Sequence, residues 1–302
     1  MRIVASSSYL PSKKVLNEEI EKKLNLETNY IEKRTGIKQR YFVQNETIEE
    51  MSIKAIEKLI NAAKIDVQEI DMIIVATTTT NNLMPGISNY IQKYFDIKKC
   101  ISFDILAGCN GYINALDIAQ MYIKSGKVNK GIVVGVDILS KYTDEKDVGT
   151  AIILADGAGA TLIEKSENEY FSNIEAIPDK DDILTIKSDE KISMDGISVY
   201  KYAVTETVKN INQLLEIANE KIENIKYVVP HQSNLKIIKA ISNRLGTEKI
   251  YTNIQNVGNT FCASIPIVLE EMQKKNLLKT GDKIILLGYG GGLNTGSILL
   301  EI

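Results

Sequence analysis

Two stretches of the sequence, "IKAIEKLINAAKIDVQEIDMIIV" at residues 53–75 and "VKNINQLLEIANEKIENIKYVVP" at residues 208–230, align without a gap at an offset of 155 residues. In each stretch apolar residues at helical spacing come first and a short, continuously apolar run follows. Each copy therefore predicts a helix, a loop and a buried strand. Two further blocks repeat in the same order, residues 130–136 with 283–289 and residues 159–164 with 296–301.

These repeats predict a duplicated α/β unit. We place the boundary after the last matched block of the first copy. The N-terminal half then spans residues 1–165 and carries the candidate nucleophilic cysteine, and the C-terminal half spans residues 166–302.

The composition is that of a globular protein, with 44% hydrophobic and 25% charged residues among 302. A net charge of −3 does not favour nucleic-acid binding, and no apolar segment approaches the roughly 18 residues of a membrane span. The first residues contain only a short apolar run, which is not typical of a secretory signal. We therefore expect a cytoplasmic protein that binds neither nucleic acid nor a membrane.

Few residues are available for metal binding or for imidazole chemistry. The cysteines Cys100, Cys109 and Cys262 form no C-x-x-C pair, so the sequence predicts neither a metal site nor a disulfide framework. His231 is the only histidine and must supply any imidazole that acts near neutral pH.

The stretch "AGCNGY", residues 107–112, follows a strand-like run and opens a predicted helix. A cysteine at a helix start meets the positive end of the helix dipole and free N–H groups, which are expected to lower its pKa. Gly108 and Gly111 let a substrate approach the backbone closely. These features favour Cys109 as a nucleophile over the alternative of a small buried filler, whereas Cys100 and Cys262 are interpreted as packing residues.

The duplication also predicts which side chains meet. Matching the helices that follow, at an offset of 151, places Cys109 opposite Thr260 and beside Asn259. His231 comes directly after the strand of the second copy, and Ser233 is expected to cap the next helix. Because chemistry in such sheets gathers at the carboxyl ends of strands, we expect cysteine, histidine and asparagine to converge there.

A glycine-rich stretch, "GYGGGLNTG" at residues 288–296, lies close to the C-terminus. It lacks the lysine of a P-loop and does not open a helix, so phosphate binding is disfavoured. Backbone N–H groups in such a turn could instead stabilise an oxyanion.

Several motifs together carry a wider resemblance: "RTGI" (34–37), "IIVATTTT", "DILAGCNGY", "DGAGA" (156–160), "PHQSNLKII", "GNT" followed by "ASIP", and "GYGGGLNTGS". In this order they resemble the β-ketoacyl-acyl-carrier-protein synthase III family over nearly the whole chain. The resemblance implies a thiolase-like fold in which two pseudo-symmetric halves form five layers, αβαβα.

The resemblance also implies roles for the site residues. Cys109 would be the acyl-accepting nucleophile, His231 and Asn259 would promote decarboxylation, and Gly291 would complete an oxyanion hole with the Cys109 N–H. The implied reaction joins an acyl group, taken from acyl-CoA or an acyl-carrier thioester, to malonyl-acyl-carrier protein. It needs neither a metal nor a redox cofactor.

Binding and assembly residues follow from the same resemblance. It implies that Tyr30, Arg34 and Lys236 contact coenzyme A or its phosphopantetheine arm. Carrier-protein docking would use Lys236, Lys239 and Arg244, which share one sector of a helical wheel; a merely solvated helix face is the alternative. Met84 and Phe261 would line the acyl pocket of a homodimer.

The chain departs from the family pattern at several positions. Tyr30 replaces a tryptophan, Val148 an arginine, Ile197 an asparagine and Lys236 an arginine, while Phe261 stands where serine is commoner. The substitutions weaken contacts to coenzyme A and suggest a specialised homologue whose primer arrives on a carrier protein. Two alternatives stay open: a same-fold acyltransferase that uses an alcohol or amine, and an inactive heterodimer partner.

Overall fold

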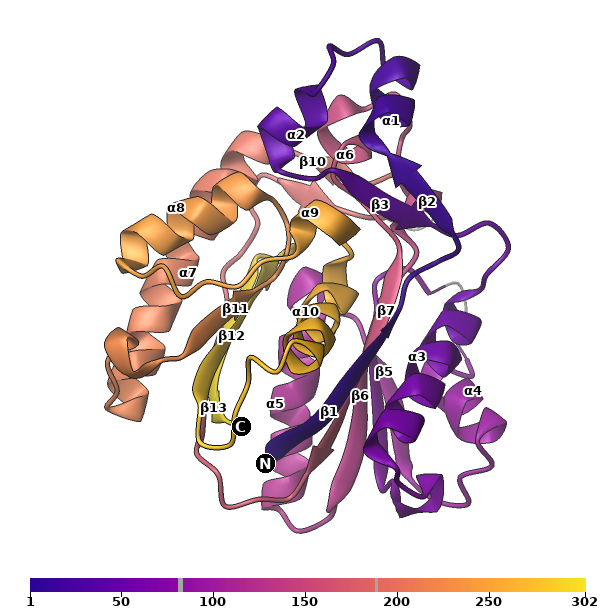
Figure 1. The fold of residues 1–302 in the computed structure, drawn as a ribbon, viewed down its shortest axis with the longest axis vertical. Coiled ribbons are helices and arrows are strands. Elements are labelled where there is room, and N and C mark those ends of the chain that lie inside the picture. The colour runs from indigo at the N-terminus through magenta and orange to yellow at the C-terminus, as the bar shows by residue number, and fades with distance from the viewer. Residues whose placement is uncertain (81–83, 188–189) are drawn as a thin grey trace.

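The computed structural model describes residues 1–80, 84–187 and 190–302, and helices and sheets alternate through it in five layers (Figure 1). The five-layered αβαβα fold predicted above is therefore confirmed. One sheet has the strand order β1-β7-β6-β4-β5 and the other the order β11-β12-β13-β8.

The first sheet is formed by strands of the N-terminal half: β1 (Arg2–Tyr9), β4 (Met72–Ala76), β5 (Ile101–Ile105), β6 (Lys130–Asp137) and β7 (Gly157–Glu164). Strand β4 pairs in parallel with both β5 and β6, whereas β7 runs antiparallel to β6 and β1. Strand β5 forms one edge of this sheet.

The second sheet contains β8 (Tyr170–Ala176), β11 (Tyr227–Pro230), β12 (Lys283–Gly290) and β13 (Asn294–Glu301). Strands β11 and β12 are parallel, while β13 runs antiparallel to both β12 and β8. The parallel strands β4 and β11 are almost fully buried because helices cover both faces of each sheet, whereas the edge strand β5 is partly buried throughout.

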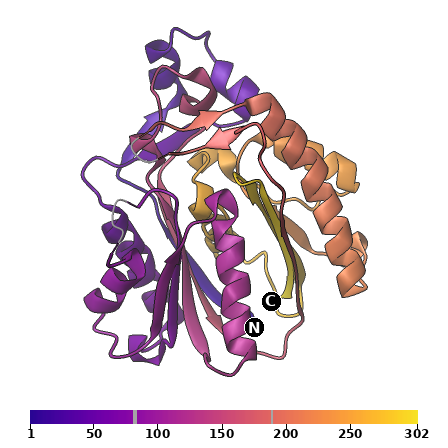
Figure 2. The ribbon, with the colours of Figure 1, turned by 180° about the vertical axis from the view of Figure 1, so that it is seen from behind.

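Helices fill the remaining three layers (Figures 1 and 2). The middle layer holds α5 (Gly111–Lys124) and α10 (Ser264–Lys274). The outside of the first sheet is covered by α3 (Ile48–Ala63) and α4 (Ile87–Tyr94). The outside of the second sheet is covered by α7 (Gly196–Ala218) and α8 (Leu235–Leu245). One continuous apolar core surrounds the middle helices and takes residues from both sheets, among them Met72, Leu116, Val229, Leu269 and Leu286.

Smaller elements gather at one end of the molecule, at the top of Figure 1. They are β2 (Lys13–Leu16), α1 (Asn17–Lys23), α2 (Tyr30–Thr35), β3 (Gln39–Phe42), α6 (Val148–Ala151), β9 (Leu184–Thr185), β10 (Ser193–Met194) and α9 (Ile254–Val257). Arg40 on β3 is fully buried and donates to the carbonyl of Ile152 at 2.6 Å, which fastens this end to the chain around Ile152.

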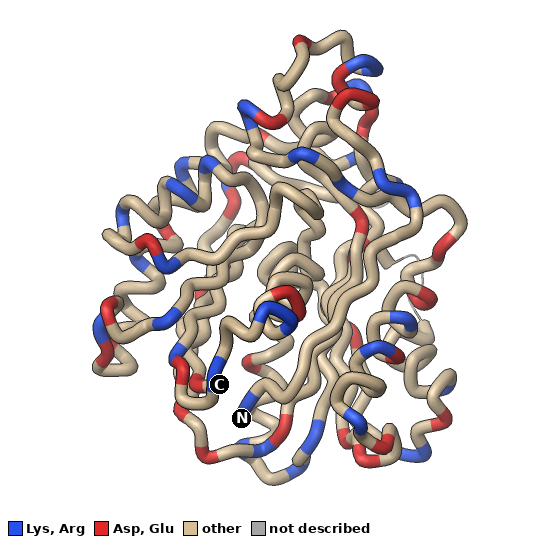
Figure 3. The backbone as a smooth tube through the Cα atoms, viewed as in Figure 1, with Lys and Arg blue, Asp and Glu red and all other residues tan. Residues whose placement is uncertain are grey.

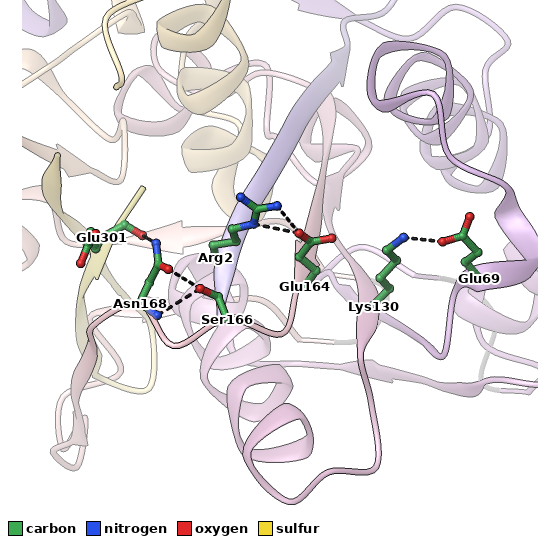
Figure 4. A network of polar contacts seen from close by, with 7 residues as sticks. All are labelled: Arg2, Glu69, Lys130, Glu164, Ser166, Asn168 and Glu301. Carbon is green, nitrogen blue, oxygen red and sulfur yellow. Dashed lines mark hydrogen bonds and ion pairs between the residues drawn. The ribbon is translucent and has the colours of Figure 1, made fainter. Parts of the chain in front are cut away.

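Exposed polar contacts lie along other strand ends, as Figure 4 shows. Arg2 pairs with Glu164 and Lys130 with Glu69, while Asn168 donates to the carbonyl of Glu301 at 3.4 Å. Ion pairs this exposed contribute little to stability. None of the helices in the described ranges is long and apolar enough to cross a bilayer.

The structure confirms the repeated helix–loop–strand unit in detail. Helices α3 and α7 end at Ala63 and Ala218, and each is followed by a residue in the left-handed region, Lys64 (φ 53°) and Asn219 (φ 50°). Short 3-10 helices, η1 (Val67–Glu69) and η4 (Ile222–Asn224), then lead into β4 and β11 at the same offset of 155.

The predicted match between the turns that precede the two middle-layer helices was wrong by two residues. Helix α5 follows the 3-10 helix η2 (Gly108–Asn110), and α10 follows η5 (Phe261–Ala263), an offset of 153 and not 151. Cys109 therefore corresponds to Cys262 and not to Thr260. The error arose because apolar helical patterns shifted by a few residues still align, whereas the turn geometry fixes the register.

Candidate active site

Cys109 lies in the middle of η2, between the end of β5 and the start of α5. Gly108 before it has a φ of 55°, a left-handed conformation that glycine adopts without steric cost. The Cys109 side chain is only 4% exposed. Burial, together with the negative charge of Asp137, raises the pKa of the Cys109 thiol. The expectation that the helix start would lower this pKa was therefore wrong, because desolvation opposes the thiolate more strongly.

His231 follows β11 directly and is held by its backbone and its ring. The backbone N–H of His231 donates to the carbonyl of Leu287 at 2.7 Å. The ring nitrogen Nδ1 lies 2.7 Å from the hydroxyl of Ser264. Burial lowers the pKa of the imidazole to about 3, so the ring is neutral at pH 7. The aromatic ring of Tyr289 packs edge-on against it, with 5.4 Å between ring centroids.

Asn259 lies between α9 and η5 and is fixed by both its backbone and its side chain. Its N–H donates to Ile153 O at 2.9 Å, and its carbonyl accepts from Ala155 N at 2.8 Å. The amide oxygen Oδ1 accepts the N–H of Phe261 at 3.1 Å. The side-chain NH2 group is thus the part of Asn259 left to donate to a substrate.

These three side chains line one cavity of about 70 Å³, together with apolar residues from the surrounding loops and helices. The apolar lining includes Ile153, Leu154, Ile192, Val199 and Phe261. Phe261 is 5% exposed and has a φ of 45°, which is rare for a bulky residue. The structure therefore brings the predicted nucleophile, imidazole and amide to a single apolar chamber.

Glycines of the C-terminal turn press against the cysteine. A Cβ built on Gly290 would lie 3.1 Å from the Cys109 sulfur and 3.2 Å from its nitrogen, so only glycine leaves that space open. The nitrogen of Gly291 lies 3.6 Å from an ideal Cβ on Gly108. The glycine turn and the cysteine turn are therefore adjacent, as an oxyanion hole shared between them requires.

The predicted coenzyme A residues lie outside the lining of this cavity. Tyr30 and Arg34 share helix α2, and the Arg34 guanidinium lies 5.3 Å from the centre of the Tyr30 ring. A Cβ on Gly36 would lie 2.5 Å from the Leu235 Cβ, so α2 ends against the start of α8. Tyr30 is half-buried and Arg34 is exposed.

Helix α8 starts at the cavity and leads away from it. Asn234, which caps the helix by accepting the N–H of Lys236 at 2.8 Å, lines the cavity. Ser233, expected to be the cap, bonds the Tyr289 hydroxyl at 2.7 Å and is therefore a correction. Lys236, Lys239 and Arg244 are exposed along the helix, where Figure 3 shows several basic segments.

Met84 is exposed to solvent and does not line the cavity. Its side chain is 90% exposed, and that of Leu106 just beyond the edge strand β5 is 71% exposed. Met84 is therefore not part of the cavity within one chain, whereas Phe261 is.

Sequence reasoning missed two buried polar residues beside the candidate site. Ser264 is 1% exposed and forms a hydrogen bond with the imidazole of His231. The one sequence feature that could have indicated this role is that Ser264 is a polar residue at the start of an apolar helix. Asp137 is fully buried; it accepts the Thr78 N–H at 2.8 Å and the Cys262 N–H at 3.1 Å. An acidic residue ending an apolar strand was the available signal for Asp137.

Comparison with known proteins identifies relatives over the full chain. Family models described as 3-oxoacyl-[acyl-carrier-protein (ACP)] synthase III and its C-terminal part match residues 103–178 and 215–302. The chain is 37% identical to β-ketoacyl-[acyl-carrier-protein] synthase III of Clostridium novyi, covering 100% of this chain and 98% of that protein.

Solved structures agree with the sequence relatives. The crystal structure of 3-oxoacyl-[acyl-carrier-protein] synthase III from Aquifex aeolicus superposes with a TM-score of 0.96 at 36% identity, covering 100% of this chain and 99% of that one. A priming β-ketosynthase of the R1128 polyketide pathway superposes with a TM-score of 0.94 at 28% identity, covering 99% and 96%. The chain, with its thiolase-like fold, belongs to the 3-oxoacyl-[acyl-carrier-protein] synthase III family of acyl-transferring condensing enzymes.

Proposed function

We propose that this chain catalyses a decarboxylative Claisen condensation between an acyl group held on Cys109 and malonyl-acyl-carrier protein. The observation that carries the proposal is the shared cavity of Cys109, a neutral His231 and an Asn259 whose amide oxygen is already bonded. A nucleophile and two N–H donors on one apolar chamber suit a reaction that passes through an enolate.

In the first stage the Cys109 sulfur attacks the carbonyl carbon of an acyl thioester. The C–S bond of the incoming thioester breaks, and the thiol proton of Cys109 leaves with the departing thiol. The Cys109 N–H and the Gly291 N–H hold the carbonyl oxygen while it carries negative charge. Covalent capture divides one difficult transfer into two easier ones.

In the second stage the malonyl thioester loses carbon dioxide and its carbonyl becomes an enolate oxygen. The Gln232 N–H donates to Ser264 Oγ at 3.4 Å, so the Ser264 proton is free to point at His231 Nδ1. The imidazole proton then resides on Nε2, which donates to the enolate together with the Asn259 NH2 group. Each such donor contributes ~2.7–4 kcal/mol in a preorganised site.

The enolate carbon attacks the acyl-Cys109 carbonyl to complete the reaction. A carbon–carbon bond forms, the C–S bond to Cys109 breaks, and the released thiolate takes up a proton. The product is a β-ketoacyl thioester on the carrier protein. Fatty acid synthesis, or a related polyketide-like route, is the class of pathway that uses it.

The surface around α8 is proposed to receive the carrier protein. Lys236, Lys239 and Arg244 offer exposed positive charge along α8, the helix that starts at the cavity, and this charge complements an acidic carrier. The exposed apolar side chain of Ile197, 70% exposed at the start of α7, lies on the helix that also lines the cavity. Tyr30 and Arg34 would contact the phosphopantetheine arm or the nucleotide of coenzyme A.

The primer is proposed to arrive preferentially on a carrier protein, since Val148 and Ile197 supply no polar contact for coenzyme A. Steady-state rates with acetyl-CoA and with acyl-carrier donors would test this. A strong preference for acetyl-CoA would refute it.

We also infer a cytoplasmic homodimer. Among the described residues no strand pairs with the outer edge of β5. Exposed Leu106 follows β5 directly, and exposed Met84 precedes a segment that Asp104 of β5 holds by accepting the Ile87 N–H. A second copy pairing on this edge would bury both and bring Met84 towards the neighbouring acyl pocket. A molecular mass near 33.6 kDa by light scattering would contradict the dimer.

The function is tested by intact-protein mass spectrometry and by trapping labelled carbon dioxide from malonyl-carrier protein. Wild type is expected to retain the acyl group and release carbon dioxide, Cys109→Ala to retain none, and His231→Ala or Asn259→Ala to acylate but lose condensation by about 100-fold or more. Cys100→Ala, remote from the cavity, is the matched control. Acylation without carbon dioxide release would favour the same-fold acyltransferase, and absence of acylation an inactive partner.

A further inference from the structure

The second half of the fold carries a cysteine at the position that matches the nucleophile. Cys109 is the middle residue of η2 and Cys262 the middle residue of η5. The residue before each has a left-handed φ, 55° at Gly108 and 45° at Phe261. The duplicated turns therefore share one geometry, although only one of their thiols lines the cavity.

The thiol of Cys262 points at the turn that holds Cys109. Its sulfur lies 3.0 Å from the carbonyl oxygen of Gly108, with the geometry of an S–H···O hydrogen bond. The N–H of Gly111 donates to the same oxygen. Cys262 is 1% exposed, and a Cβ on Gly111 would lie 3.2 Å from its sulfur, so the thiol has little room to turn away.

The backbone of Cys262 is equally fixed. Its N–H donates to Asp137 Oδ2 at 3.1 Å, and a Cβ on Gly135 would lie 2.1 Å from its carbonyl oxygen. Burial and the charge of Asp137 raise the pKa of the Cys262 thiol well above its ordinary value, so it keeps its proton at pH 7. A protonated thiol on an immobile backbone is a fixed hydrogen-bond donor.

The acceptor of that bond is part of the catalytic machinery. Gly108 C=O and Cys109 N–H are the two ends of one planar trans peptide, and they point in opposite directions. Whatever holds the oxygen therefore sets the direction of the N–H. A carbonyl that accepts hydrogen bonds also makes its own amide N–H a stronger donor, because the bonds polarise one another.

We propose that Cys262 is a positioning residue, whose thiol donates to Gly108 O and thereby aims and polarises the Cys109 N–H at the carbonyl oxygen of the substrate. The inference rests on the proposed function, because that N–H serves the oxyanion in both the acylation and the condensation stage. It assigns a role to a cysteine that is neither nucleophile nor metal ligand. Cys109 still performs the covalent chemistry.

Three substitutions separate this role from simple packing. Cys262→Ala removes the donor, Cys262→Val removes it while filling more of the space, and Cys262→Ser restores a donor on a shorter side chain. Thermal melting checks the fold of each variant. Cys100→Ala is the control for loss of a thiol away from the site.

Kinetics and infrared spectroscopy then measure how well the oxyanion site stabilises and polarises the substrate carbonyl. We expect kcat for condensation and the single-turnover rate of Cys109 acylation by an acetyl thioester to fall about tenfold in Cys262→Ala, with KM little changed. Cys262→Ser should recover most of the loss. In the acyl-enzyme carrying a ¹³C-labelled carbonyl, the thioester stretching band should move to higher frequency without the donor and return in Cys262→Ser.

The inference is overturned if the folded Cys262→Ala variant keeps the wild-type rates and band position, or if Cys262→Ser behaves as Cys262→Ala does. If Cys262→Ala does not fold, Cys262→Val decides by the same two readouts. Wild type distinguishes the two proposals, because failure of wild type to acylate Cys109 would refute the function itself. Normal acylation in every variant would refute only the role of Cys262.

Discussion

Lowering the pH from 7 to 5 is expected to destabilise the protein through its single histidine. Burial lowers the pKa of His231 to about 3, compared with 6.5 for an unperturbed imidazole. Between these values the unfolded chain binds a proton that the folded chain refuses, so stability falls as the pH falls. The stability that the neutral His231 side chain contributes is fully present above pH 6.5 and is lost progressively as the pH falls towards 3.

The magnitude follows from the two pKa values. Proton linkage at a single site with these values lowers the free energy of unfolding by about 2 kcal/mol between pH 7 and pH 5. Buried Asp137 and Asp156 act in the opposite direction, because burial raises the pKa of each carboxyl and their protonation relieves the folded state. A measurement on wild type alone would therefore mix opposing effects.

Urea unfolding of wild type and of His231→Gln at both pH values isolates the imidazole. The carboxyl groups are common to both proteins, so the difference between their pH responses reports the histidine alone. Wild type should lose about 2 kcal/mol more than the variant. Equal losses in the two proteins would refute a buried neutral imidazole, and with it the N–H donor that the proposed condensation requires.

Three further outcomes are expected. Ser264→Ala removes the hydroxyl 2.7 Å from His231 Nδ1, so carbon dioxide release should fall roughly tenfold. Acylation of Cys109, measured by intact-protein mass spectrometry, should persist. Equal loss of acylation and of carbon dioxide release would contradict the role of Ser264 in setting the imidazole proton. Gly290→Ala places a methyl group 3.1 Å from the Cys109 sulfur and should slow acylation by about 100-fold or more, measured by rapid quench; normal acylation would show that this space is unused. Lys239→Glu should raise the KM for carrier protein about tenfold at low salt without affecting acyl-CoA, and an equal effect on both donors would argue against docking on α8.

Much of the fold follows from the repeat. Residues 53–75 and 208–230 keep apolar positions in register at one offset, and the structure ends both helices at that offset, at Ala63 and Ala218. Helix periodicity and buried strands are local patterns that burial imposes directly on sequence. The five layers were predicted from the family resemblance, which depends on the motifs and not on these periodic patterns.

The conformation of the turn before α10, and hence its match to the turn before α5, could not be predicted from the sequence. Phe261 occupies a left-handed position where glycine stands in the first half, so residue type conceals the correspondence of Cys109 with Cys262. The backbone of the next residue, Cys262, packs against Gly135, and no local preference of phenylalanine would predict a left-handed conformation before it.

The chemical groups of the site were predicted, but their protonation was not. Cys109 was placed correctly at a helix start, yet the direction of its pKa depends on burial by residues distant in sequence. Ser264 could be recognised only once the fold set its hydroxyl against the imidazole ring of His231. Such contacts join segments whose sequences carry no sign of one another.

The middle layer has a consequence for inheritance. Helices α5 and α10 come one from each half, and the apolar core around them draws on both sheets, whereas the cores on the outer faces each belong to one half. Helix α10 of the C-terminal half packs on β1 and β7 of the first sheet, so a chain cut between the halves would expose the apolar inner face of that sheet to water. Exchange of one half for that of a distant relative is therefore expected to disturb the shared middle layer first and the two outer cores least.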